Sequence, residues 1–168
     1  MSDTQAERRR IITWEDPTAT VQKGKAMSGI EYLRTLASGE FPPPPVANLI
    51  GMWIVEVSEG HAVFAAEPAE YHYNPLGTVH GGIAATLLDS AMGCAVQSVL
   101  PAGTGYTTIE LKTNYLRAMT SKTGIVHCEG KIIYVGGRIA TAEGRLTDAS
   151  GKLYAHGTTT CILIRPDR

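Results

Sequence analysis

Residues 73–93, YNPLGTVHGGIAATLLDSAMG, hold the side chains of this sequence that could do chemistry. Asp89 stands nine residues after His80, among neighbours that are nearly all small or apolar. An ionised carboxylate in such surroundings costs several kcal/mol unless it is paired or used. Two interpretations follow: an aspartate bonded to a Ser, Thr or backbone group in the core, or a general base or nucleophile whose pKa is tuned by its environment.

His80, Gly81 and Gly82 stand where a helix is expected to begin. The first turn of a helix presents unpaired N–H groups at the positive end of its dipole, and glycine lets a ligand approach them closely. Such a site suits a carbonyl oxygen that becomes an oxyanion. Asn74, in the preceding turn, could donate a second N–H to that oxygen. The alternative is that His-Gly-Gly is only a tight turn.

Gly81 and Asp89 are eight residues apart, which is about 12 Å along a helix axis. One helix therefore cannot bring both groups to the same reacting carbon. Two copies of the helix, antiparallel about a two-fold axis, can do so. If both residues are catalytic, the chain is expected to work as a homodimer with two equivalent shared sites.

The elements that must position these residues are a long buried helix and long strands. A helix is predicted at about 80–99, and because it is apolar on nearly all sides it is expected to be buried all round. Two strands joined by a turn at 58–60 are predicted from Ala47, and four more at 106–118, 124–136, 138–150 and 152–164, the last three as an antiparallel meander. The fold class is α+β: a curved antiparallel sheet wrapped around one central helix.

The beginning of the chain has a different character. Residues 1–23 are polar and are expected to form an irregular arm. A short amphipathic helix is predicted at about 28–38, because Ser28 and Glu31 have capping-box spacing and Gly39 suits a stop. The prolines of FPPPP, 41–45, favour a stiff extended connector, with a binding motif as the alternative.

Composition sets bounds on function. The 168 residues suit one domain with a real core, and a net charge of −1 gives no indication of nucleic acid or an anionic membrane. No apolar run could span a membrane, and the N-terminus does not resemble a secretory signal. The three scattered cysteines and five scattered histidines predict neither disulfides nor a metal site, so no metal or cofactor and a cytoplasmic location are expected.

The motif N-P-x-G-x-x-H-G-G with an Asp nine positions after the His resembles the hotdog-fold acyl-CoA thioesterases. The resemblance is to the phenylacetate-degradation (PaaI-like) branch of the 4-hydroxybenzoyl-CoA thioesterase superfamily, and it covers about 47–165. The pattern of residues in the predicted strands at 137–163 also resembles that of the family. The chain is accordingly divided into residues 1–45, an arm, helix and connector, and residues 46–168, a hotdog thioesterase domain.

The resemblance implies hydrolysis of acyl-CoA or aryl-CoA thioesters. Gly81 N–H and Asn74 would polarise the thioester carbonyl, and Asp89 of the partner subunit would activate water. Thr108, or its neighbour Thr107, would assist that water, and His80 would orient the loop and substrate. The family's usual assembly is a homodimer or homotetramer, and no nucleic acid or membrane partner is implied.

Four further residues are assigned to substrate binding: Gly82, Thr107, Met92 and Arg138. Met92 would lie in the core or line a pocket. Basic residues near the coenzyme A phosphates are frequent in the family, and Arg138 could be one of them or a solvated surface arginine. Two other functions on the same fold are a non-catalytic acyl-CoA-binding or regulatory module and a dehydratase or hydratase.

Overall fold

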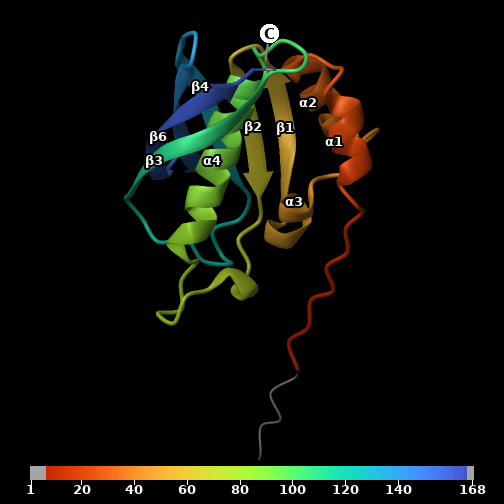
Figure 1. Cartoon of the computed structure of the whole chain (residues 1–168). Coiled ribbons are helices and arrows are strands. Elements are labelled where there is room, and N and C mark those ends of the chain that lie inside the picture. Colours follow the sequence, from red (N-terminus) through yellow and green to blue (C-terminus); the bar gives the residue numbers. More distant parts are fainter. Residues whose placement is uncertain (1–6, 166–168) are drawn as a thin grey trace, which may run out of the picture.

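The computed structural model describes residues 7–165 and shows one antiparallel sheet curved around a single helix. The helix is α4 (Gly81–Gln97), and the six strands lie in the order β1-β2-β4-β5-β6-β3 (Figure 1). The strands are β1 (Met52–Ser58), β2 (His61–Ala66), β3 (Gly105–Tyr115), β4 (Val126–Val135), β5 (Ile139–Asp148) and β6 (Leu153–Ile164). This confirms the expected hotdog fold and places the central helix within two residues of its predicted bounds.

The core is the layer between α4 and the concave face of the sheet. Leu87, Leu88 and Met92 of α4 are fully buried there, against the equally buried Cys128 and Leu146 of the sheet. The sheet comes so close to the helix at Gly130 that an added Cβ would lie 2.3 Å from the Ala91 carbonyl oxygen. This close approach fixes the position of α4 on the sheet.

The last three strands, β4, β5 and β6, pair in sequence order and confirm the predicted meander. β3 pairs with β6, the last strand of the chain, and therefore lies at the end of the sheet with one side unpaired by the strands of residues 7–165. β3 also runs along α4. This arrangement brings side chains of a sequence-distant strand against the helix that carries Asp89.

The N-terminal segment differs from the predicted arm and connector. Residues 18–24 form helix α1 (Thr18–Gly24), whose first N–H is capped by the Asp16 carboxylate at 2.8 Å. Helix α3 (Pro45–Ile50) stands where the end of the connector and the start of a strand were expected. Proline is favoured at the first position of a helix because its missing N–H would be unpaired there anyway. The fourth proline thus starts a helix, and the strand begins only at Met52.

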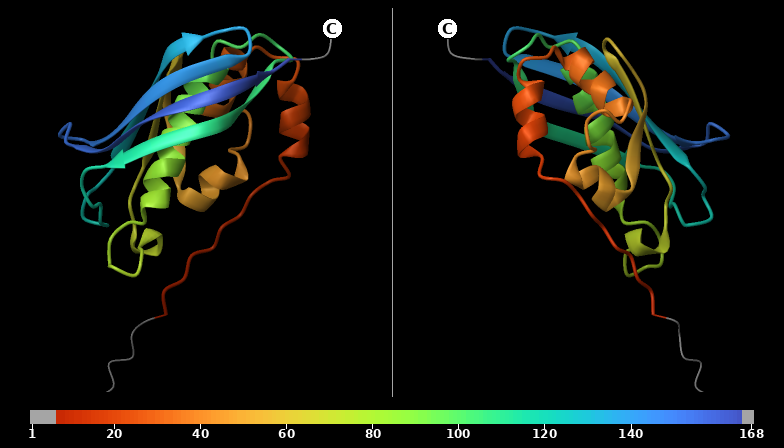
Figure 2. Two further views of the ribbon diagram at one scale, coloured as in Figure 1. Left: turned by 60° about the vertical axis from the view of Figure 1, so that its left-hand side comes forward. Right: turned by 90° about the vertical axis from the view of Figure 1, so that its right-hand side faces the viewer.

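The predicted helix at 28–38 is confirmed as α2 (Gly29–Ala37), with the Ser28–Glu31 capping box in place. Leu33 of α2 is buried, and Gly29 N–H donates to the Leu100 carbonyl at 2.9 Å, so α2 is fixed beside the C-terminal end of α4. Figure 2 shows α1 next to the start of β3 and the end of β6. The predicted arm also includes residues 1–6, which lie outside the described part of the chain.

The expectation that α4 is buried all round is wrong for the single chain. The sheet covers only part of the helix, and a stripe of partly buried or exposed residues remains along it: Gly82, Thr86, Asp89 and Ser90. The reason is that a sheet of six strands curves around one side of a helix without closing. Among the helices of residues 7–165, none is long and apolar enough to cross a membrane.

Candidate active site

The loop before α4 is organised by Asn74. Its side-chain oxygen accepts hydrogen bonds from Leu76 N–H at 2.9 Å and Thr78 N–H at 3.3 Å. Its Nδ2 donates to the Thr78 hydroxyl at 3.1 Å, which uses one of the two amide hydrogens. Within residues 7–165 the other amide hydrogen has no acceptor, so Asn74 shapes this loop and keeps one N–H for another group.

The first turn of α4 has one open donor. His80 is the N-cap: its Nδ1 accepts the Gly82 N–H at 2.9 Å, and its carbonyl accepts the Ile83 N–H at 2.9 Å. Within residues 7–165 no acceptor is found for the Gly81 N–H. The positive end of the helix dipole adds to the attraction of this donor for a partly negative oxygen.

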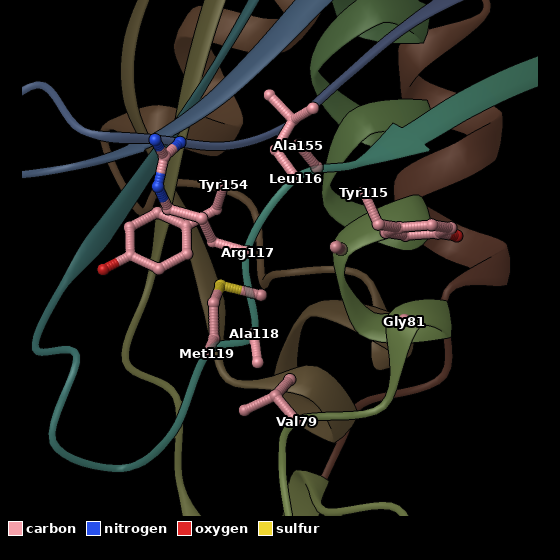
Figure 3. A pocket seen from close by; sticks show the side chains of 10 residues that line it. Val79, Gly81, Tyr115, Leu116, Arg117, Ala118, Met119, Tyr154 and Ala155 are labelled. Atoms are coloured by element: carbon pink, nitrogen blue, oxygen red, sulfur yellow. The ribbon is translucent and has the colours of Figure 1, made fainter.

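A cavity of about 310 Å³ opens at this end of the helix, and Gly81 lines it (Figure 3). The Tyr115 ring lies beside Gly81, with ring carbons 3.3 Å from where a Cβ would be. Arg117, Met119 and Tyr154 stand farther from α4 in this view. A side chain at position 81 would therefore require the Tyr115 ring to shift by a few tenths of an ångström.

His72, in the short helix η1 (Glu70–His72), supports the residue that precedes α4. Its carbonyl accepts the His80 N–H at 2.8 Å, and its own Nε2 lies 2.9 Å from the Ile50 carbonyl. Burial lowers the pKa of the His72 imidazole, which favours the neutral form. His72 is thus a fixed structural support for the loop that ends in His80.

Asp89 forms the second polar cluster. The Thr108 hydroxyl of β3 donates to Asp89 Oδ1 at 2.8 Å. The carboxylate is only partly buried, and within the described chain its other oxygen, Oδ2, has no hydrogen-bond partner. The hydrogen bond from Thr108 fits the first interpretation of Asp89, an aspartate bonded to a Ser, Thr or backbone group. The free oxygen on an uncovered face is what a general base needs.

Thr108 reaches Asp89 because β3 contains a bulge. The pairing of β3 with β6 shifts between Thr108 and Glu110, which leaves Ile109 as an extra residue. Tyr106 and Thr108 face α4 before the bulge, and Leu111 and Tyr115 face it afterwards. The bulge therefore moves the inward positions from even to odd numbers, as bulges beside functional sites often do.

The cysteines near Asp89 are unsuited to act as nucleophiles. Burial, with the Asp89 charge as a smaller cause, raises the pKa of Cys94 to about 12. Burial also raises the pKa of the Cys161 thiol, to which Asp89 contributes. Both thiols stay protonated at neutral pH, and the thiolate is the reactive form. Asp89 is therefore the group of this cluster that can accept a proton.

Three of the predicted substrate-binding residues lie away from both clusters. Thr107 is exposed, on the opposite face of β3 from Thr108. Met92 is fully buried in the core and does not line the cavity at Gly81. Arg138 is exposed in the turn between β4 and β5, where its carbonyl accepts the Leu163 N–H. The fourth, Gly82, is exposed at the helix start beside His80, with its N–H used by the cap.

The structure thus gathers Asn74, His80 and Gly81 at one end of α4, and Asp89 with Thr108 at its middle. Sequence reasoning missed Tyr115 beside Gly81 and Thr78 beside Asn74. The turn residues between Asn74 and Thr78 could have indicated the role of Thr78. The position of Tyr115 could not be predicted, because the bulge changes which residues of β3 face α4. Within residues 7–165 no group of three or more His, Cys, Asp or Glu side chains is arranged to hold a metal ion.

Comparison with known proteins agrees with this arrangement. The family model of the thioesterase superfamily matches residues 76–155, which include the start of α4, Asp89 and Thr108. A crystallised protein from the thioesterase superfamily is 30% identical, with a TM-score of 0.65, over 82% of this chain and 98% of that one. A mutant of the phenylacetic acid degradation protein PaaI from Thermus thermophilus is 27% identical, with a TM-score of 0.65, over 73% of this chain and 100% of that one.

A curated protein of Halobacterium salinarum, whose name places it provisionally among the esterases, is 42% identical over 75 residues. That match spans 42% of this chain and 50% of the relative, so the chain spans about half the length of this curated relative. The solved relatives, by contrast, are covered almost completely. The similarity of sequence and fold over that length leads to one conclusion: the chain belongs to the thioesterase superfamily.

Proposed function

We propose that this protein hydrolyses acyl-CoA or aryl-CoA thioesters at a site shared by two chains. The observation that carries the proposal is the Asp89–Thr108 pair, with a free carboxylate oxygen on the uncovered stripe of α4. The open Gly81 N–H at the start of the same helix supplies the complementary electrophilic group.

In the proposed reaction the thioester carbonyl accepts hydrogen bonds from Gly81 N–H and the remaining Asn74 N–H. Asp89 of the partner subunit takes a proton from water through Oδ2, and the water oxygen attacks the carbonyl carbon. The tetrahedral oxyanion is held by the two N–H donors and then collapses with cleavage of the C–S bond. The proton on Asp89 passes to the leaving thiolate, which gives free acid and coenzyme A.

Two features support the participation of a second chain. Gly81 and Asp89 lie eight residues apart on one helix, which separates them by about 12 Å. The half-exposed stripe of α4 and the free edge of β3 also leave a surface that a second copy could cover. A homodimer follows, and the family resemblance extends this expectation to a homotetramer.

The first experiment is a steady-state assay of the purified protein against a panel of acyl- and aryl-CoA esters, with detection of the free thiol. Release of coenzyme A that depends on Asp89 would support the proposal. Binding of the esters without turnover would contradict it and would favour an acyl-CoA-binding module. Hydration of an enoyl ester without thiol release would indicate a hydratase.

The second experiment tests the shared site by mixing two inactive variants, Asp89→Asn and Gly81→Val. A mixed dimer has one site with both lesions and one site with neither. A random mixture should therefore regain roughly a quarter of wild-type sites, because about half of the dimers are mixed. Demonstrated subunit exchange without recovered activity would contradict the shared site.

A further inference from the structure

A second and larger cavity, of about 850 Å³, lies between the N-terminal helices and the C-terminal half of α4. Its volume is within the range of small-molecule sites. Val21 of α1 and Leu36 of α2 form one wall, and Cys94, Tyr106 and Ile164 belong to the other. Figure 2 shows α1 beside the start of β3 and the end of β6.

The cavity lies about one turn of α4 beyond the Asp89–Thr108 pair, and neither residue of the pair lines it. Cys94 follows Asp89 by five residues on α4, which is about 7.5 Å along the axis. Tyr106 precedes Thr108 by two residues on the same face of β3, a separation of about 7 Å. Its hydroxyl packs on Gly93, where an added Cβ would lie 2.4 Å from it. A chain held at Asp89 would therefore have to run about 7 Å along β3, past Tyr106, to enter the cavity.

The lining selects the chemistry of the occupant. Most of the cavity wall is aliphatic, aromatic or thiol, so a phosphate or nucleotide in its interior would lose its hydration. Its two charged side chains, Lys25 and Arg165, are exposed and therefore lie toward solvent. The interior suits an apolar chain.

On the basis of the proposed function, we infer that this cavity binds the acyl chain of the thioester, and that α1 and α2 set how long that chain can be. Both helices lie outside the segment that matches the family model, residues 76–155. This wall therefore belongs to the N-terminal segment, outside that match. The expected substrate class is aliphatic acyl-CoA of medium or greater length.

The test narrows the cavity from its exposed wall. Val21→Trp places a larger ring on α1 at a lining residue, and Gln22→Trp places the same ring on the exposed neighbour that lines no described cavity. With Val21→Trp, kcat/KM for decanoyl-CoA should fall at least about tenfold, while that for acetyl-CoA changes less than about twofold. Gln22→Trp should leave both values unchanged.

A second variant changes the opposite wall of the cavity. Cys94→Phe should lower kcat/KM for decanoyl-CoA by the same factor and leave that for acetyl-CoA unchanged, with Cys94→Ser as its near-isosteric control. Equal losses for both esters, or no loss for decanoyl-CoA in Val21→Trp, would overturn the inference. If these variants lowered kcat/KM for phenylacetyl-CoA and not for decanoyl-CoA, the assignment to an aliphatic chain would also be overturned.

A binding measurement separates this inference from the proposed function. The non-hydrolysable thioether decyl-CoA is titrated calorimetrically into the wild type, Val21→Trp and Gln22→Trp. Tight binding that Val21→Trp weakens at least about tenfold supports the cavity whether or not the protein hydrolyses esters. Absence of hydrolysis with such binding would reject the proposed function alone. Equal affinity in all three proteins would reject the acyl site alone.

Discussion

The two parts of the candidate site lie on one helix, at the start and at the middle of α4, and they offer opposite chemical groups. The start of α4 has an open N–H at Gly81, a cavity in front of it and a loop held by Asn74 and His72. The middle of α4 has a carboxylate, Asp89, that lines none of the described cavities and is positioned by Thr108 from another element. One region offers donors and the other an acceptor.

The difference follows from where each group lies on a helix. Backbone donors are free only in the first turn, so an oxyanion site belongs there. In the middle of a helix all backbone groups are paired, so a reactive group must be a side chain whose partner comes from a neighbouring strand. A single chain therefore separates donor from base, and this separation is the reason to expect a second chain.

The largest expected effect is that of removing the base. Asp89→Asn keeps the size of the side chain but cannot accept the proton of water, so turnover should fall on the order of 100-fold or more. Steady-state thioester hydrolysis measures it, with circular dichroism to show that the protein folds. Retention of most of the activity would exclude Asp89 as the base.

A smaller effect is expected from removal of the Asn74 donor at the start of the helix. Asn74→Ala and Asn74→Asp both lose the amide N–H, but only Asp keeps an oxygen that Leu76 and Thr78 N–H can reach. Turnover of both variants should fall by less than the roughly 100-fold that loss of one oxyanion donor can cause, because the Gly81 N–H remains. Wild-type turnover in Asn74→Asp would show that Asn74 only shapes the loop.

The contact that positions the base should contribute less. Thr108→Val removes the hydroxyl that donates to Asp89 Oδ1, and a hydrogen bond to a charged group is worth about 1.5–3 kcal/mol, so turnover should fall roughly tenfold or more. Thr108→Ser keeps the hydroxyl and should restore most of the rate. Thr107→Val, on the exposed face, is the matched control and should have no effect.

The smallest effect concerns Thr113, on β3 between the contacts to Asp89 and to Gly81. Its hydroxyl is buried and has no hydrogen-bond partner within residues 7–165. Thr113→Val should raise the free energy of unfolding by about 1 kcal/mol, because it replaces an unpaired hydroxyl with a methyl group of similar volume. Urea denaturation measures this. A loss of stability would instead mean that the hydroxyl finds a partner in the assembled protein.

Much of the fold could be predicted from residue patterns because those patterns are local. The alanine- and leucine-rich run identified α4, the Ser28–Glu31 spacing identified α2, and the turns between strands gave the meander. The errors arose where local signals competed. Proline both breaks and starts helices, so the proline run predicts a connector, although Pro45 begins α3.

The sequence by itself determined the candidates for reaction that we propose: the start of α4 at Gly81, the lone carboxylate Asp89, and their spacing on one helix. It could not determine which side chains meet across elements. The pairing of β3 with β6 and the bulge after Thr108 decide that Thr108, and not Thr107, reaches Asp89. The positions of α1 and α2 near the end of α4 likewise create a cavity that no local pattern predicts. These contacts join residues far apart in the chain, so only the packing of the whole fold could establish them.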